Sequence, residues 1–253
     1  MLVNNIIDII ESAAPLGWQE EWDNSGLQVG KRNADVKAVL LTTDITESVV
    51  AEAIERHCEM IVSHHPLLFH GLKQVCGQTP QARCVEMAIR HDIAIYSSHT
   101  AMDSWLHGVS GRMAEKIGMR DYRILEGEEH GLGVIGELDQ ALPLEAFVAQ
   151  VKRAFDAPVL RYVEGAKNEI KTVALCGGAG SEFVEEAIAQ GADAFITADV
   201  KYHTFLDVAG RIALIDMDHW VSEHFTREIF QELLDGKVNT LISEQDHSPV
   251  KTM

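Results

Sequence analysis

Six residues combine side chains that often bind divalent metals with a spacing that would bring them together. They are the adjacent histidines His64 and His65, the pair His99 and Asp103, and the pair His219 and Glu223. In the last two pairs the carboxylate follows the histidine by four residues, which places both side chains on one face of a helix. An imidazole nitrogen and a carboxylate at that separation can hold one ion from a single helical turn.

This donor set suits two divalent ions per chain, about 3.5–4 Å apart, that share a bridging carboxylate, a role for which Glu223 has two oxygens. It contains nitrogen and oxygen but no sulfur, which favours Zn, Mn, Fe, Co or Ni over clusters or Cu(I) and does not select among them. Such ions would lower the pKa of bound water toward neutrality, as in a hydrolase. The alternative is that these residues cap helices or form salt links, which is the commoner role of each taken singly. Their gathering at strand ends favours a metal site.

The sequence around His64 and His65 predicts that a strand ends there. Residues 60–62 are apolar, and Pro66 lacks an N–H and restricts the residue before it. The histidines would then lie at the exit of the strand, where α/β folds place their ligands. Neighbouring side chains on an extended chain point to opposite sides, so we expect the two histidines to serve different ions.

Apolar periodicity predicts an alternation of strands and helices along the chain. Strands are expected at 37–43, 60–63, 93–97, 134–138 and 159–163, and helices at 3–11, 47–56, 80–90, 109–117, 144–155 and 220–234. Thr46 is suited to cap the second helix and Pro80 to begin the third. The β-α-β-α-β order of the first half predicts α/β architecture, with a mainly parallel sheet covered by helices.

The second half of the chain repeats the first. Residues 37–66 align with residues 171–200 without a gap, and His64 and His65 fall opposite Ala198 and Asp199. With a one-residue slip, the His99–Asp103 pair falls opposite the His219–Glu223 pair. We therefore expect a duplicated α/β unit, with a first repeat at 1–125, a bridging segment at 126–165 and a second repeat at 166–253.

Composition excludes several classes of protein. The formal net charge is −18 and the sequence has no basic run, which disfavours nucleic-acid binding. Four scattered cysteines without a Cys-x-x-Cys motif indicate a reducing, cytoplasmic setting. The first eleven residues lack the basic start of a signal peptide, and no apolar run is long enough for a membrane span.

The chain resembles a known family over nearly its whole length. The resemblance is carried by WDNSGLQVG at 22–30, SHHPLLF at 63–69 and the two histidine–carboxylate pairs, in that order. These motifs resemble those of the NIF-three-like dinuclear metal-centre proteins, often labelled GTP cyclohydrolase I type 2 homologues. The resemblance implies two intertwined α/β repeats and a toroidal homohexamer with metal sites facing an inner cavity.

The resemblance also implies roles for individual residues. His64, His219 and Glu223 would hold one ion, and His65, Asp103 and Glu223 the other. His99 would stand beside them as a candidate catalytic base or a support for the ligands. The chain departs from the family pattern beside His219, with Asp218 before it and Trp220 after it, and at the segment 197–199, which is Thr-Ala-Asp here. We expect neither departure to contact a ligand.

Two functions from different classes are compatible with these observations. The first is a metal-dependent hydrolase that cleaves a C–N, ester or phosphoester bond of a small nucleotide-like molecule. The second is a non-catalytic metal-binding ring, or a regulatory partner of protein or single-stranded DNA, although the charge disfavours DNA. The segment 201–203, Lys-Tyr-His, is expected either to face the mouth of the site or to begin an ordinary helix. Turnover in a broad hydrolase screen would separate the two functions.

Overall fold

The computed structural model describes residues 1–252 and divides the chain into two compact units. The first unit comprises Met1–Met102 and His224–His247, and the second comprises Asp103–Glu223 and the residues after His247. The chain therefore leaves the first unit between Met102 and Asp103 and returns to it between Glu223 and His224. Because of these two crossings, each unit is built from two separate stretches of the chain. This is the intertwining that the resemblance implies.

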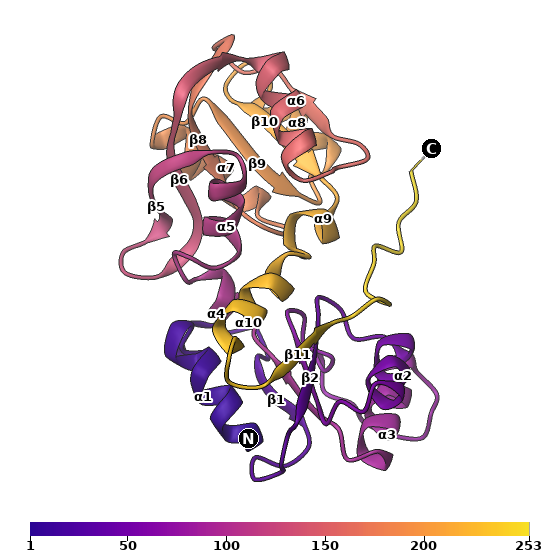
Figure 1. The fold of residues 1–253 in the computed structure, drawn as a ribbon. Coiled ribbons are helices and arrows are strands. Elements are labelled where there is room, and N and C mark those ends of the chain that lie inside the picture. The colour runs from indigo at the N-terminus through magenta and orange to yellow at the C-terminus, as the bar shows by residue number, and fades with distance from the viewer. Residues whose placement is uncertain (253) are drawn as a thin grey trace. The chain divides into compact units, whose positions relative to one another are not determined.

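The first unit is a sheet covered by helices on both faces (Figure 1). Its elements are α1 (Val3–Ala13), η1 (Leu16–Trp18), β1 (Gly26–Val29), β2 (Ala38–Thr42), α2 (Glu47–Glu55), β3 (Met60–Ser63), α3 (Pro80–Arg90), β4 (Ala94–Ser97), α10 (Thr226–Leu234) and β11 (Asn239–Ile242). Within residues 1–252, five of these strands pair in the order β1-β4-β3-β2-β11. All neighbours are parallel except β1, which runs antiparallel to β4.

Strand alternation decides which side chains of this sheet meet which helices. Leu40, Ile61 and Ile95 point to one face and pack with Val50 of α2 and Ala88 of α3. Alternate residues of the same strands face α1 and α10, which lie on the other side of the sheet. The strands are buried on both faces, as expected of a parallel sheet between helical layers.

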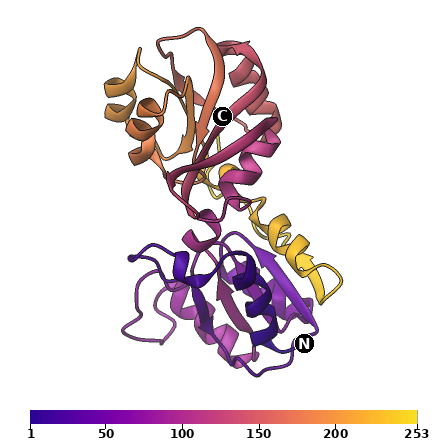
Figure 2. The same ribbon diagram turned by 90° about the vertical axis from the view of Figure 1, so that its left-hand side faces the viewer.

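The second unit has the same layers built on a larger sheet. Its elements are α5 (Val109–Lys116), β5 (Met119–Gly127), β6 (Gly131–Pro143), α6 (Leu144–Ala154), β7 (Arg161–Val163), β8 (Glu169–Leu175), η2 (Ser181–Phe183), α7 (Val184–Ala189), β9 (Ala194–Ala198), α8 (Tyr202–Val208), β10 (Ala213–Met217) and α9 (His219–Glu223). Among the described residues, six strands pair in the order β5-β6-β8-β9-β10-β7. The magenta and pink helices α5 and α6 cover one face in Figure 2, and the orange helices α7 and α8 cover the other.

Strand register confirms the duplication. In the first unit Val39 pairs with Met60, and in the second Val173 pairs with Ala194, which are the positions aligned with them in sequence. The third strands continue the match, because β4 and β10 are each parallel to the strand before them. The fold is therefore α/β, with two sheets built on the same parallel three-strand core.

A hydrogen-bonded turn is also repeated in both units. Glu59 Oε2 accepts hydrogen bonds from the backbone N–H groups of Lys37 and Ala38 at 2.9 and 3.1 Å. In the second unit Asp193 Oδ2 accepts from Lys171 and Thr172 at 2.9 and 2.8 Å. In each unit the carboxylate directly before the second parallel strand accepts from two consecutive backbone N–H groups in, or just before, the strand that pairs with it. The sequence comparison did not single out this device.

The structure differs from the predictions in three places. The strand predicted at 134–138 is the longer β6, and β6 and β7 belong to the second sheet, so much of the segment 126–165 forms part of that unit. The helix predicted at 220–234 is interrupted at His224 and Phe225, which separate α9 from α10. The strand β11, which pairs with β2, was not predicted at all. The three-part division into repeats at 1–125, 126–165 and 166–253 stays a prediction.

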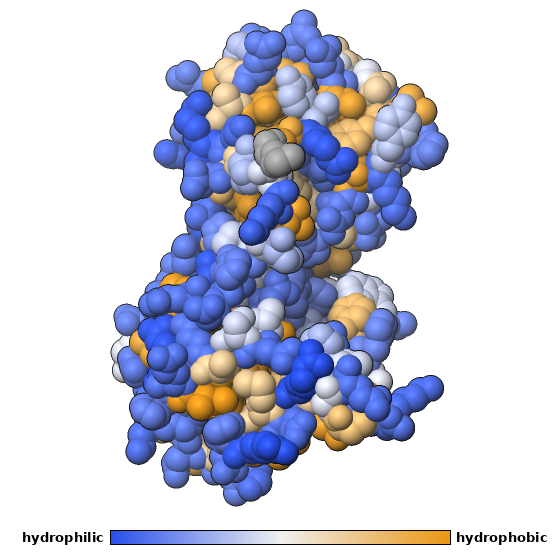
Figure 3. Space-filling view, turned by 90° about the vertical axis from the view of Figure 1, so that its right-hand side faces the viewer, coloured by the Kyte–Doolittle hydropathy of each residue, from blue (hydrophilic) through white to orange (hydrophobic). Residues whose placement is uncertain are grey.

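The surface is mainly hydrophilic. Hydrophilic residues cover most of each unit on the face shown in Figure 3, and hydrophobic residues occur there in small patches. No helix among residues 1–252 combines the length and the apolar character that crossing a membrane requires. The four cysteines are free thiols, three of them buried.

Candidate metal centre

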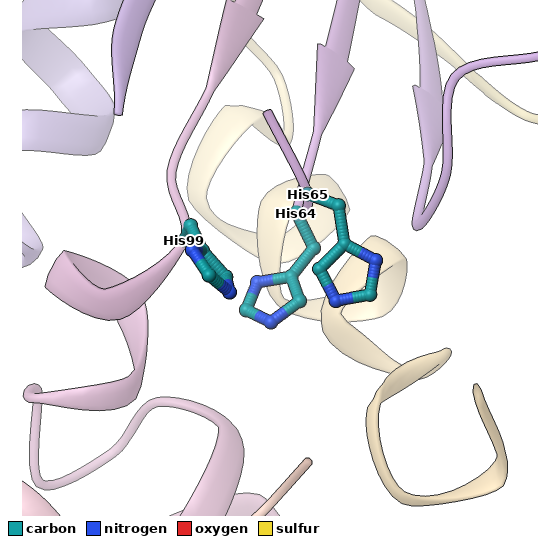
Figure 4. Close-up of side chains that lie close together, drawn as sticks. All are labelled: His64, His65 and His99. Carbon is teal, nitrogen blue, oxygen red and sulfur yellow. The ribbon is translucent and has the colours of Figure 1, made fainter. Parts of the chain in front are cut away.

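Three histidines gather at the carboxyl ends of β3 and β4 in the first unit. The ring centroids of His64 and His65 lie 4.9 Å apart, and His99 lies 5.3 and 5.4 Å from them. One ring nitrogen of each lies within 4.8 Å of the others (Figure 4). The prediction that His64 and His65 point to opposite sides is wrong, because β3 ends at Ser63 and the chain bends at the two histidines.

In all three imidazoles the Nδ1 atom has an oxygen acceptor. His65 Nδ1 lies 2.8 Å from Asp44 Oδ1, and His99 Nδ1 lies 2.9 Å from Asp23 Oδ1. The acceptor for His64 is the backbone carbonyl of Ser98, at 3.2 Å. Carboxylate and carbonyl oxygens accept but do not donate, so each Nδ1 carries the proton and each neutral ring has its lone pair on Nε2. This is the arrangement of histidines that bind metals through Nε2.

Asp23 is the most strongly engaged of these acceptors. Its Oδ2 accepts hydrogen bonds from Ser25 Oγ at 2.8 Å and from Thr100 N and Oγ1 at 3.1 and 2.6 Å. Burial alone would raise the pKa of the Asp23 carboxyl, but the hydrogen bond and electrostatic attraction of the His99 ring, with the Thr100 and Ser25 bonds, lower that pKa well below its usual range. Asp23 therefore stays ionised and fixes the orientation of His99.

In the second unit His219 and Glu223 lie on one turn of α9, as predicted. His219 Nε2 is 3.0 Å from Glu223 Oε2, and His219 Nδ1 is 2.8 Å from Asp199 Oδ2. The expectation that segment 197–199 contacts no ligand is therefore wrong for Asp199. A divalent cation could use His219 Nε2 and the Glu223 carboxylate together as ligands.

A glycine loop makes room for the Glu223 side chain, which is only 3% exposed. Gly178 follows β8 with φ +63°, and a Cβ atom there would collide with Glu223 Oε1. The Gly178 N–H donates to Ser222 Oγ at 3.0 Å, which ties the loop to α9. A carboxylate oxygen of Asp103 lies within 4.8 Å of one of Glu223, so the second unit brings two acidic donors together.

Cys176, at the end of the same strand, does not add a thiolate to this donor set. Burial, followed by the negative charges of Asp103, Glu182 and Glu223, raises the pKa of the Cys176 thiol well above its usual value. The thiol therefore stays protonated at neutral pH, and the set of donors in the second unit is nitrogen and oxygen, as predicted from the sequence.

The sequence reasoning missed the acceptors that orient the imidazoles. Asp44, Asp23 and Asp199 each follow or precede a strand by a few residues, but a single aspartate in a loop has no distinctive spacing. The usable signal for Asp23 was its place in the WDNSG motif. The segment 201–203 begins α8, and Tyr202 is exposed there, so the structure gives these residues no role in either donor set.

The donor atoms fit divalent cations. Neutral imidazoles with Nε2 lone pairs, fixed by oxygen acceptors, are the usual nitrogen ligands of Zn and its neighbours in the first transition row. The carboxylates of Asp103 and Glu223 supply negative charge in the second unit. Each unit therefore contains side chains that could serve as metal ligands.

Comparison with known proteins identifies the family. The model of the family described as Duf34/NIF3 (NGG1p interacting factor 3) matches residues 1–249. The chain belongs to the Duf34/NIF3 family. This confirms the resemblance inferred from the His-His-Pro motif and the two histidine–carboxylate pairs.

Members of the family are similar over their full lengths. A protein of Clostridium acetobutylicum named GTP cyclohydrolase 1 type 2 homolog is 34% identical, and the match covers 98% of each chain. A Streptococcus pneumoniae protein of the same name is 35% identical, over 90% of this chain and 89% of the relative. The crystal structure of a Staphylococcus aureus hypothetical protein, SA1388, has a TM-score of 0.91 at 26% identity and covers 100% of this chain and 99% of that one.

Proposed function

We propose that this Duf34/NIF3 protein binds two divalent metal ions and is a hydrolase acting on a small nucleotide-like substrate. The ligands in this proposal are His64, His65, Asp103, His219 and Glu223. The observation that carries it is the common state of the imidazoles: His64, His65, His99 and His219 each have Nδ1 within hydrogen-bonding distance of an oxygen acceptor. An oxygen acceptor on Nδ1 is the arrangement that fixes the orientation of metal-binding imidazoles and leaves Nε2 as the coordinating nitrogen.

The proposal requires that both units serve one pair of ions, and the path of the chain supports this. His99 belongs to the first unit and Asp103 to the second, and the short helix α4 (Thr100–Asp103) connects them. Four helical residues advance the chain by only about 6 Å. Glu223 is likewise the last residue before the chain returns to the first unit. Two of the proposed acidic ligands therefore lie at the crossings themselves.

Divalent ions in this site would supply Lewis acidity to the bond that is cleaved and to the attacking water. The protein's own contribution is to orient donors and to move a proton. His99 has its Nδ1–H on the ionised Asp23, so Nε2 is the atom that would accept a proton from water and return it to the leaving group. Asp23 would stabilise the imidazolium that forms in between. His99 is thus the proposed catalytic base.

Elemental analysis of protein purified without chelator or affinity nickel tests this function. We expect about two ions per chain in the native protein. We expect a Glu223→Ala variant to lose at least one ion and to lose turnover in a hydrolase screen. Native protein that carried no metal would contradict the proposal.

The matched control is Glu52→Gln. Glu52 is also a buried carboxylate, but it accepts hydrogen bonds from Ser243 Oγ and from the N–H groups of Glu244 and Gln245, at 2.5, 3.0 and 3.3 Å, and so anchors the segment after β11. This variant should be less stable and keep its full metal content. Loss of metal in both variants would mean that general destabilisation, rather than loss of a ligand, removes the ions.

The assembly and location are proposals of the same kind. A homohexamer is expected from the family resemblance, and light scattering of the purified protein would test it. A cytoplasmic location is expected from the scattered free thiols, since a reducing compartment keeps them unpaired.

A further inference from the structure

Two large aromatic rings are exposed beside the histidine cluster. Trp22 is 58% exposed and Phe69 is 41% exposed. Their ring centroids lie 5.8 Å apart, and they lie 5.9 and 6.2 Å from the ring of His99. His99 in turn contacts the rings of His64 and His65. The aromatic pair therefore adjoins the proposed proton-transfer residue within the first unit.

Hydrogen bonds hold the segments that carry the two rings. Asn24 Nδ2 donates to the Leu68 carbonyl at 2.6 Å, and the Leu68 N–H donates to Gln28 Oε1 at 3.1 Å. Gln28 Nε2 closes the loop by donating to the Asn24 carbonyl at 2.6 Å. Trp22 also directly precedes Asp23, which is fixed by its bonds to His99 and Thr100. Exposure of the rings is thus imposed by a bonded network and is not the result of a loose loop.

The orientation of the rings defines what they could contact. The planes of Trp22 and Phe69 are inclined by 50°, so the rings form a corner instead of stacking on each other. A planar ligand ring can stack on one of them and meet the other with its edge, which is the favoured geometry of aromatic contacts. Exposed aromatic surface next to a site is commonly functional, because leaving it in water has a cost in free energy.

We propose that Trp22 and Phe69 form a stacking subsite for a planar heteroaromatic ring of the substrate, beside the bond that His99 serves. This inference rests on the proposed function, and it names the residues that would hold the base of the nucleotide-like substrate. A single ring is favoured over a nucleic-acid strand because the formal net charge of −18 repels a phosphate backbone. Glu20 and Glu21, which precede Trp22, add to that repulsion.

Equilibrium dialysis of the full chain tests the subsite with two probes that differ only in the ring. Guanosine 5′-monophosphate carries the base, and ribose 5-phosphate lacks it. Stacking of one base on an aromatic side chain changes affinity by about 5- to 150-fold. We expect native protein to bind the nucleotide more tightly by a factor in that range. The Trp22→Ala and Phe69→Ala variants should each reduce that preference several-fold, and Trp22→Phe should largely keep it.

The control variant is Tyr162→Ala. It removes a ring that is 42% exposed, close to the exposure of Phe69, from β7 of the other unit. It should keep the full preference. Equal affinity for the two probes in native protein, or an unchanged preference in both Trp22→Ala and Phe69→Ala, would overturn the subsite.

Two further measurements, of metal content and of mass, keep this test separate from that of the proposed function. Metal content is measured on every sample. If native protein carries no metal, the hydrolase proposal fails, whereas the ratio of the two probe affinities still decides the subsite. The mass of each variant is measured by light scattering. A Trp22→Ala variant that dissociates into smaller species while the probe preference is unchanged would show that the rings bind another copy of the chain, which also overturns the subsite.

Discussion

The carboxyl edges of the two sheets have the same scaffold and different chemistry. Both edges end the parallel core of one duplicated unit, and the same hydrogen-bonded turn, at Glu59 and Asp193, precedes the second strand in each. At the edge itself, His65 of the first unit aligns with Asp199 of the second, and Asp44 aligns with Gly178. The turn that supports the strands is thus the same in both units, whereas these aligned positions at the edge carry different residues.

The differences between the two edges show how one duplicated fold can supply two complementary sets of potential metal ligands. In the first unit Asp44 orients His65, and in the second Asp199 orients His219. In both cases the aspartate follows one strand and the histidine follows the next. Glycine at position 178 removes the side chain that Asp44 has in the first unit, and Glu223 occupies the space. The first edge thus supplies imidazoles, and the second supplies a buried carboxylate.

The largest effect on metal affinity is expected from replacing the aspartates that orient His65 and His219. Asp44→Asn and Asp199→Asn keep the shape of the side chain and remove its charge. We expect each to weaken metal binding by about 10- to 100-fold, because the acceptor on Nδ1 raises the basicity of Nε2. Competition against a chromophoric chelator measures this. Unchanged affinity in both variants would show that the equivalence between the two edges has no role in metal binding.

A smaller effect is expected from filling the space at Gly178. In Gly178→Ala the new methyl group meets the Glu223 carboxylate, and the positive φ adds about 1–3 kcal/mol of backbone strain. The matched control is Gly191→Ala, which has φ +82° and no atom within 4 Å of the new Cβ. Both variants should lose stability in urea denaturation, Gly178→Ala the more because of its collision with Glu223, and only Gly178→Ala should lose metal affinity, by about tenfold. Equal metal affinity in the two variants would contradict the role given to the glycine.

The smallest effect concerns the shared turn. Glu59→Gln and Asp193→Asn should each lower the free energy of unfolding by about 1 kcal/mol, because a charged acceptor for backbone N–H groups becomes neutral. Neither should alter metal content. A much larger effect in one unit than in the other would break the equivalence of the two repeats.

The same turn predicts a dependence of stability on pH. In both carboxyls burial acts to raise the pKa. It is outweighed by hydrogen bonds from Lys37 and Ala38 to Glu59, and by those from Lys167, Thr172 and Lys171 to Asp193, so each folded pKa lies below the ordinary value of 4.5 or 3.8. A lowered pKa stabilises the fold above the ordinary value, and this stabilisation is lost as the pH falls through the folded pKa. Urea denaturation between pH 6 and about pH 3 should therefore show native stability falling more steeply than that of the two variants.

Local sequence pattern predicted the elements of the parallel cores well, because their signals are short-range. Thr46 accepts a hydrogen bond from Val49 N at the start of α2, and Pro80 begins α3, as expected from capping rules. The break between α9 and α10 was missed, because apolar spacing at Phe225, Ile229 and Phe230 continues through it. The pairing of β11 with β2 joins segments about 200 residues apart, and no local pattern encodes such a contact.

The proposed metal ligands could be predicted from the sequence better than the residues that orient them or make room for them. His219 and Glu223 have a helical spacing that sequence alone can interpret, and the structure places them 3.0 Å apart. Asp23 is separated from His99 by 76 positions in the chain, so only the folded sheet shows that they meet. The role of Gly178 was not predicted, because the sequence does not show that a Cβ atom at this position would collide with Glu223.

The central claim is that the imidazoles of the first unit and the carboxylates of the second bind the same pair of ions. Anomalous X-ray diffraction from crystals of metal-loaded protein tests it most directly. We expect two anomalous peaks, with Nε2 of His64 or His65 and an oxygen of Glu223 bound to the same ion at about 2.0–2.2 Å. Peaks coordinated by residues of only one unit, or histidines and Glu223 bound to separate ions that share no ligand, would contradict it.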